Sequence, residues 1–245
     1  MKELDLKLLE AFSAKQKSNN QYNLISFNKH SETRVLIVTS VSAEKEAVLR
    51  GLNSDSRFEV LVAGVGSVVA AVNTSRALSS AEYSLVICAG IGGGFSGKAE
   101  VGSLVVATQI VAADLGAETS EGFCSLDELG FGFTLIQIDT NLVDLVTQAL
   151  QEAKLPVNTG PVLTVSTVTG SAASAVELAS RVPGATAEAM EGFGVSFAAL
   201  DHGVPVLEIR AISNRVGPRD RSAWRIKEAL DVLEAACSVL TEAFL

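Results

Sequence analysis

Short apolar runs alternate with helical patterns from Arg34 to the end of the chain, and this alternation constrains the fold more than any other feature. Residues 35–39 form the first apolar run, a helical pattern over residues 43–52 follows, and the same order recurs along the chain. Strands that alternate with helices build largely parallel sheets covered by helices on both faces. The pattern therefore predicts an α/β fold, a single three-layer α/β/α domain with a mixed, largely parallel central sheet.

The apolar periodicity also predicts where the elements lie. Strands are expected over residues 35–39, 58–63, 85–89, 104–112, 161–166, 185–187 and 206–212. Helices are expected over residues 43–52, 67–80, 141–154, 172–181, 192–201 and 222–244, with Ser42 as the N-cap of the first. Residues 114–132 have the composition of a long loop. Residues 1–33 are predicted to be an appendage of unknown role, with a helix over residues 4–12, and residues 34–245 are predicted to be the functional domain.

The composition excludes several classes of protein. The chain has 19 Lys and Arg against 28 Asp and Glu, a formal net charge of −9, whereas nucleic-acid-binding domains carry a basic surface. Three scattered cysteines and two isolated histidines give no metal signature and indicate no cofactor. No apolar stretch reaches the ~20 residues of a membrane-spanning helix, and no secretory signal is recognisable. We expect a cytoplasmic protein that binds a small molecule, without nucleic-acid or membrane partners.

Two glycine-rich segments follow predicted strands. Gly64-Val-Gly66 lacks the third glycine of a dinucleotide-binding motif, which favours a tight turn. In the second segment, Gly90-Ile91-Gly92-Gly93-Gly94, four of five residues are glycine. Glycine lets a backbone approach a ligand closely, so a turn that binds a ligand is one interpretation, and a flexible bend is the other.

Polar side chains follow three other strands or begin the helices after them. Ser213 and Asn214 end an apolar strand, at the edge where open α/β sheets bind ligands. Glu44 begins a helix and is placed either to activate water or to interact with the helix dipole. Glu188 and Glu191 flank Met190 near another helix start, and a carboxylate there can accept hydrogen bonds from a vicinal diol such as that of ribose.

In their order along the chain, these segments resemble the nucleoside phosphorylase and nucleosidase superfamily over about residues 34–240. The resemblance rests on five motifs: Ser-Ala-Glu44, Ala-Gly-Ile-Gly-Gly-Gly94, Val-Ser166-Thr, Ala-Met-Glu191-Gly and Arg-Ala-Ile-Ser213-Asn214. A closer resemblance, to superfamily members that release hypoxanthine from a nucleoside with a carboxylated aromatic tail, rests on the segments 113–117, 164–170 and 212–221 and on Trp224. It implies a purine nucleosidase that works without a cofactor.

The resemblance also implies roles for individual residues. Glu44 falls on the acid that activates water, and Met190 and Glu191 fall on the pair that holds the ribose. Gly90, Ile91 and Gly92 match the turn that lines sugar and base, and Val168, Thr169 and Gly170 match the segment whose backbone contacts the purine. Asn214 replaces the aspartate of the methylthioadenosine nucleosidases. Because an amide can donate to N7 or to an oxygen at C6, Asn214 favours a 6-oxopurine.

Several alternatives stay open from the sequence. A purine nucleoside phosphorylase would keep the same fold but use phosphate, and a nucleoside-binding module would lack turnover. Arg219 and Arg221 are candidates to bind the carboxylated tail, although both could instead pair with Asp220. The superfamily usually assembles from several subunits, so we expect a homodimer or a higher homo-oligomer.

Overall fold

A computed structural model describes residues 25–27 and 34–244 of the chain. The helix predicted over residues 4–12 lies outside the described residues, and the division at residue 33 stays a prediction. Seventeen elements follow one another: β1 (Val35–Thr39), α2 (Ser42–Leu52), β2 (Phe58–Val62), α3 (Ser67–Ser80), β3 (Leu85–Gly94), β4 (Leu104–Ala112), β5 (Gly116–Thr119), β6 (Gly122–Ser125), β7 (Leu135–Gln137), α4 (Thr140–Glu152), β8 (Val157–Thr164), α5 (Ala172–Arg181), β9 (Ala187–Ala189), α6 (Gly192–Asp201), β10 (Val206–Arg215), the 3₁₀ helix η1 (Arg221–Ala223) and α7 (Ile226–Ala243).

The central sheet is mixed and largely parallel, as predicted. Its strand order is β10-β4-β8-β9-β3-β1-β2, with β7 attached to β4. Strand β10 also pairs with β3, so β3, β9, β8, β4 and β10 close into a ring while β1 and β2 extend from it. Five pairings are parallel, and β10–β4, β3–β9 and β4–β7 are antiparallel. The ring brings the ends of β3, β9 and β10 next to one another.

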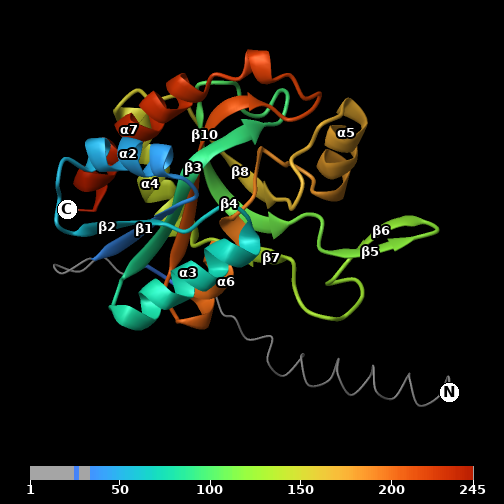
Figure 1. Cartoon of the computed structure of the whole chain (residues 1–245), viewed down its shortest axis with the longest axis horizontal. Helices are drawn as coiled ribbons and strands as arrows, with labels where there is room; N and C mark the ends of the chain where they lie inside the picture. The colour runs from blue at the N-terminus through green and yellow to red at the C-terminus, as the bar shows by residue number, and fades with distance from the viewer. Residues whose placement is uncertain (1–24, 28–33, 245) are drawn as a thin grey trace.

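Helices cover both faces of the sheet (Figure 1). Helices α2, α4 and α7 pack together on one face, and α3 packs on α6 on the other. The strands between them are buried on both faces, which explains their almost continuous apolar sequences. Leu36, Ile87 and Leu207 are among the fully buried side chains of this core. No helix of residues 25–27 and 34–244 is long and apolar enough to cross a membrane.

The glycine-rich segment after Ala89 is strand, not the predicted turn. Residues 90–94 continue β3, pair in parallel with β10, and at Gly93 and Gly94 also pair with β9. Glycine is required there because neighbouring groups come close: a Cβ on Gly90 would lie 2.6 Å from Glu44 Oε1, and one on Gly92 would lie 2.9 Å from the carbonyl oxygen of Glu188. The glycines therefore admit functional side chains from other elements rather than bend the chain.

Other boundaries differ from the predictions for local reasons. The expected loop over residues 114–132 contains the hairpin β5–β6, which projects from the body of the molecule and whose short strands hold no buried residue and carry no apolar periodicity (Figure 1). Ser42 is the first residue of α2 and not its N-cap; Val41 holds that position. Strand β9 lies two residues later than expected, and β10 runs on to Arg215. Apart from the hairpin, these differences are shifts of a few residues at the ends of elements, where local sequence constrains structure least.

Candidate active site

A cavity of about 300 Å³ opens where β3, β9 and β10 end. It is lined by Ser40, Val41, Glu44, Val65, Ile91, Gly92, Gly93, Val168, Glu188, Ala189, Met190, Glu191, Ser213, Asn214 and Trp224. A larger hollow of about 420 Å³ lies beside the β5–β6 hairpin, between Phe123 and Arg181, and holds none of the predicted site residues. The smaller cavity is the candidate active site because the predicted acids and the predicted amide meet there.

Glu44 is held rigidly at the start of α2. Its side chain is buried, with 3% of its surface exposed. Oε2 accepts hydrogen bonds from the amides of Ser40 (2.8 Å) and Val41 (3.3 Å), and Oε1 accepts one from the amide of Ile91 (2.8 Å). A carboxylate offers about four acceptor positions, so acceptor capacity remains on a group whose orientation is fixed by β3 and by its own helix.

Glu191 lies at the N-cap position of α6 and lines the same cavity. Its Oε1 accepts a hydrogen bond from the amide of Gly66 (3.0 Å), and its Oε2 lies 3.7 Å from Arg210 Nη2. The Gly64-Val-Gly66 segment is the tight turn that the sequence predicts, since both glycines have positive φ. Met190 lines the cavity beside Glu191 and supplies an apolar surface. The turn after β2 therefore positions one of the predicted acids.

A fully buried arginine, Arg210, lies beneath the cavity. Its Nε donates to Glu208 Oε1 (2.8 Å) and its Nη2 donates to Cys88 Sγ (3.0 Å). A Cβ on Gly90 would touch both Glu44 Oε1 and Arg210 Nη1, so these two groups flank the same glycine. Burial opposes the charge of Arg210, but Cys88, Glu208, Glu191 and Glu44 act together in the opposite direction, and the pKa of the guanidinium is raised. Arg210 therefore stays positive.

Cys88 and Glu208 respond to the same burial. Burial raises the pKa of the Cys88 thiol well above its usual value, so Cys88 is a thiol beside Arg210. Burial also raises the pKa of Glu208, although Arg210 opposes this effect. Oε2 of Glu208 has no hydrogen-bond partner within the described part of the chain. The charges of Glu208 and Arg210 therefore depend on each other.

Asn214 lies at the opposite wall, on β10. Its Oδ1 accepts a hydrogen bond from Ser213 Oγ (2.8 Å), and its Nδ2 donates to the carbonyl oxygen of Arg215 (3.0 Å). A carboxamide nitrogen has two N–H groups, so one remains for a ligand. Asn214 is half-buried and lines the cavity, as its place at the strand end predicts.

The segment from Val168 to Gly170 forms a third wall. Val168 lines the cavity, whereas Thr169 is buried behind it and donates through its amide to Glu188 Oε1 (2.9 Å) and through its hydroxyl to Glu188 Oε2. Gly170 accepts a hydrogen bond from the amide of Arg219 (3.0 Å). Burial raises the pKa of Glu188, and its bonds to Thr169 oppose that shift. The segment is tied to β9 by one carboxylate.

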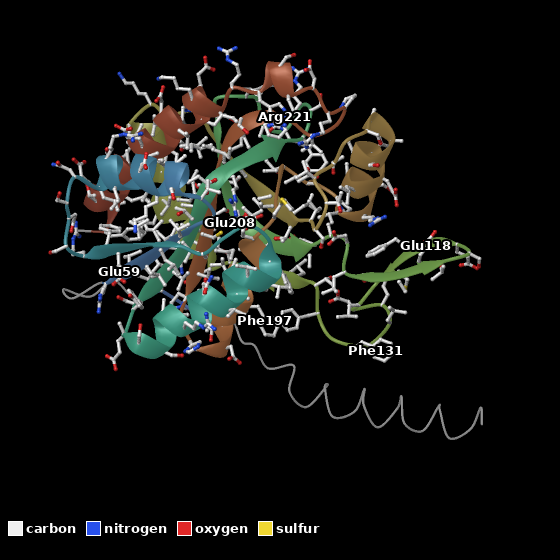
Figure 2. The ribbon with its side chains drawn as sticks, in the orientation of Figure 1. Glu59, Glu118, Phe131, Phe197, Glu208 and Arg221 are labelled. Atoms are coloured by element: carbon white, nitrogen blue, oxygen red, sulfur yellow. The ribbon has the colours of Figure 1, made fainter. Side chains whose placement is uncertain are left out.

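Arg219 and Arg221 do not line the cavity. The guanidinium of Arg219 lies over the ring of Trp224, 5.1 Å from its centroid, and Trp224 is the residue that reaches the cavity. Arg221 is exposed and begins η1, and Figure 2 shows it close to the ends of β3 and β10 in that view. Asp220 bonds to Ser222, and within the described residues it forms no ion pair with either arginine. The alternative that Asp220 pairs with them is therefore wrong for these residues.

The structure brings most of the predicted residues together and adds others. Those that line the cavity are Glu44, Ile91, Gly92, Val168, Met190, Glu191 and Asn214, whereas Gly90, Thr169, Gly170, Arg219 and Arg221 do not. Sequence reasoning gave no role to Glu208 or Arg210, named Trp224 only as part of the resemblance, and offered Glu188 only as one of two candidate carboxylates for a diol. Glu208 and Arg210 carried a usable signal, since two charged residues interrupt an otherwise apolar strand and charges in such a place must be paired.

The charged side chains that line the cavity are all acidic. Three carboxylates line it, those of Glu44, Glu188 and Glu191, and no Lys or Arg of the described residues does. The nearest buried cation, Arg210, is engaged with Glu208 and Cys88. Within the described ranges, no cluster of His, Cys, Asp and Glu is placed to hold a metal ion. Such a cavity suits a ligand that is neutral or develops positive charge, and disfavours an anion.

Comparisons with known proteins identify the relatives of this chain. The model of the Phosphorylase superfamily matches residues 13–245. A futalosine hydrolase of Streptomyces coelicolor is 49% identical over 226 residues, which cover 84% of this chain and 94% of that protein. A futalosine hydrolase of Acidothermus cellulolyticus is 46% identical over 222 residues, covering 85% and 91%.

Solved structures agree at the level of the fold. The native futalosine hydrolase of Helicobacter pylori has a TM-score of 0.74 at 19% identity, covering 87% of this chain and 99% of that one. The 5'-methylthioadenosine/S-adenosylhomocysteine nucleosidase of the same organism, solved with butyl-thio-DADMe-Immucillin-A, has a TM-score of 0.74 at 19% identity, covering 87% and 98%. The predicted three-layer architecture is confirmed.

Proposed function

Because this chain belongs to the Phosphorylase superfamily and, within it, to the futalosine hydrolase family, we propose that it hydrolyses the N-glycosidic bond of futalosine. The products are hypoxanthine and dehypoxanthine futalosine, and the reaction serves menaquinone biosynthesis. One observation carries the proposal beyond the family: Glu44, Glu191 and Asn214 line a single cavity from three different elements. This hydrolysis needs an acid that activates water, an acid that binds the sugar and an amide that stabilises the leaving base.

Glu44 acts on water in this proposal. As the glycosidic bond lengthens, the ribose gains the character of an oxocarbenium ion, and water attacks its anomeric carbon. The three amides that fix Glu44 leave about one acceptor position, which is available to that water. Glu44 takes a proton from the water as the new C–O bond forms, which is general base catalysis by a pre-oriented carboxylate.

Glu191 and Met190 hold the ribose. Glu191 is fixed by the amide of Gly66 and by the charge of Arg210, and its remaining acceptor positions are suited to the sugar hydroxyls. Met190 provides an apolar surface for the sugar ring. Gly90, Ile91 and Gly92 complete this subsite as strand residues, because the two glycines leave room beside β3 and the backbone amide of Ile91 binds Glu44.

Asn214 stabilises the leaving base. Negative charge develops on the purine as the bond breaks, and the second N–H of the Asn214 amide can donate to N7 or O6. Val168, Thr169 and Gly170 form the neighbouring wall, with Val168 against the base. This arrangement supports hypoxanthine as the leaving group.

The charges of the cavity favour water over phosphate as the nucleophile. Phosphate is an anion and would enter a space lined by three carboxylates without a lysine or arginine of the described residues. Like charges at close range are unfavourable, most of all where burial excludes water. The same carboxylates stabilise the positive charge that develops on the ribose. Hydrolysis is therefore the reaction that this lining supports.

The tail of the substrate and the assembly belong to the same proposal. Trp224 lines the cavity and carries Arg219 on its ring, so this pair is placed to meet a carboxylated aromatic group, and the exposed Arg221 is the second candidate for the carboxylate. Exposed valines along α3, such as Val68 at 78% and Val72 at 46% exposure, support a homodimer or higher homo-oligomer because subunit interfaces cover such surface. A cytoplasmic location stays a prediction.

Base release is the experiment that tests the proposal. Futalosine, inosine and methylthioadenosine would each be incubated with and without phosphate, using the wild type, Glu44→Gln and Glu46→Gln. Glu46 is exposed on the same helix two residues away, so it is a matched control. We expect release of hypoxanthine from futalosine without phosphate, reduced ~10²-fold or more in Glu44→Gln and unchanged in Glu46→Gln. Phosphate-dependent cleavage of inosine would replace the proposal with a phosphorylase, and absence of release would favour a binding module.

A further inference from the structure

Glu188 is a buried acid of the cavity to which the proposed mechanism gives no role. It lies in β9, has 4% of its surface exposed, and lines the cavity together with Val168 and Asn214. Its carboxylate accepts two hydrogen bonds, both from Thr169. Burial of a carboxylate without further hydrogen-bond or ionic partners costs free energy. The position of Glu188 in a ligand cavity therefore needs an explanation.

The other buried acids of the site differ from Glu188 in their partners. Glu208 bonds to Arg210 at 2.8 Å, and Glu191 lies 3.7 Å from the same guanidinium. Glu188 forms no ion pair with any residue of the described ranges. The two bonds from Thr169 leave about half of its acceptor positions unused. A hydrogen-bond donor on a ligand is a fitting partner for them.

The register of the strands places Glu188 across from Asn214. Glu188 pairs with Gly93 between β9 and β3, and Gly93 pairs with Asn214 between β3 and β10. The two polar residues therefore flank one glycine from opposite sides, two strand spacings or about 10 Å apart. A Cβ on Gly93 would lie 3.2 Å from Asn214 Nδ2, so glycine keeps the space between them open. That space suits a planar base that forms hydrogen bonds along two of its edges.

We propose that Glu188 accepts the N1–H of a 6-oxopurine and thereby selects hypoxanthine against adenine. A 6-oxopurine presents a donor at N1 and acceptors at O6 and N7, which match an acceptor at Glu188 and a donor at Asn214. Adenine presents an acceptor at N1, which would face the carboxylate lone pairs without a proton between them. The inference rests on the proposed function for the identity of the substrate. It adds Glu188 to Asn214 as a second residue that recognises the base.

The structural alternative is that Glu188 only anchors the segment from Val168 to Gly170 through Thr169. The two roles predict different effects on the affinity for purine bases. Loss of an anchor weakens the binding of every base equally, whereas loss of the N1 acceptor changes the ratio between hypoxanthine and adenine. Thr169→Val removes one anchoring bond and keeps the carboxylate, so it serves as the matched comparison.

The test is calorimetric binding of free hypoxanthine and free adenine to the full chain, which does not depend on turnover. The proteins are the wild type, Glu188→Gln, Thr169→Val and, as a distant control, Glu118→Gln on the projecting hairpin (Figure 2). We expect the wild type to prefer hypoxanthine and Glu188→Gln to lose about 10- to 100-fold of that preference, the usual effect of a hydrogen bond to a charged group. Thr169→Val and Glu118→Gln should keep the ratio.

Two results would overturn the inference. One is a wild type that binds adenine as tightly as hypoxanthine. The other is a Glu188→Gln variant that binds both bases more weakly by the same factor, as the anchoring role requires. Failure of the proposed function looks different, because a chain that selects hypoxanthine but releases no base from futalosine would keep the inference and lose the reaction.

Discussion

Removal of Arg210 should destabilise the protein through the acids that it leaves behind. In Arg210→Met, Glu208 keeps its place in the core with 0% exposure and loses its 2.8 Å partner, and Glu191 loses a positive charge at 3.7 Å. Breaking a buried pair from one side costs about 3–5 kcal/mol. For a chain of this size we therefore expect the melting temperature to fall by about 6–20 °C.

A double variant separates charge from packing. In Arg210→Met/Glu208→Leu the orphaned carboxylate is replaced by an apolar side chain, and a buried ion pair exchanged for apolar residues is often neutral or stabilising. We expect the double variant to recover at least half of the lost stability, measured by thermal and urea unfolding, while base release stays impaired because Glu191 still lacks its cation. If the double variant is as unstable as Arg210→Met, the loss comes from packing and the reasoning about charge is wrong.

The pH dependence gives an independent check with a definite sign. Burial already raises the folded-state pKa of Glu208 above its unfolded value, and Arg210 counteracts the shift. A raised carboxyl pKa favours the folded state at low pH, and this stability is lost as the pH rises through the folded pKa. Without Arg210 the folded pKa rises further. The stability deficit of Arg210→Met should therefore be larger at pH 8 than at pH 5, and a deficit that does not change with pH would contradict the account.

Two further predictions concern groups outside the cavity. Asp139 caps α4 by accepting the amide of Asn141 at 3.0 Å and also accepts the amide of Phe27, so Asp139→Ala should cost about 1–2 kcal/mol in urea unfolding; a cost near zero would mean that the cap is dispensable. A thiol reagent should label at most one of the three cysteines in the folded protein, because Cys88 and Cys237 are buried and burial raises the pKa of Cys237 to about 12; rapid labelling of two thiols before unfolding would disagree with this burial.

The apolar pattern predicted best those elements whose burial follows one regular pattern along the whole element. The strand over residues 104–112 and the helices over residues 172–181 and 192–201 were predicted to the residue, since each shows either a continuous apolar run or an apolar side in its local sequence. The hairpin β5–β6 was missed because both strands are short and hold no buried residue. The extension of β3 was missed for another reason. Glycine disfavours strands locally, and only pairing with β9 and β10, which lie far away in sequence, offsets that preference.

The same distinction explains what the sequence revealed of the site. Glu44, Glu191 and Asn214 stand at ends of strands and starts of helices, so topology alone predicts that they meet. Arg210 and Glu188 lie within strands, and their roles depend on which strand is adjacent. Arg210 reaches Glu191 because β10 runs beneath the start of α6, and Glu188 faces Asn214 only because β3 lies between β9 and β10. Pairing between distant segments, which no local motif encodes, turns these two charged residues into parts of the site.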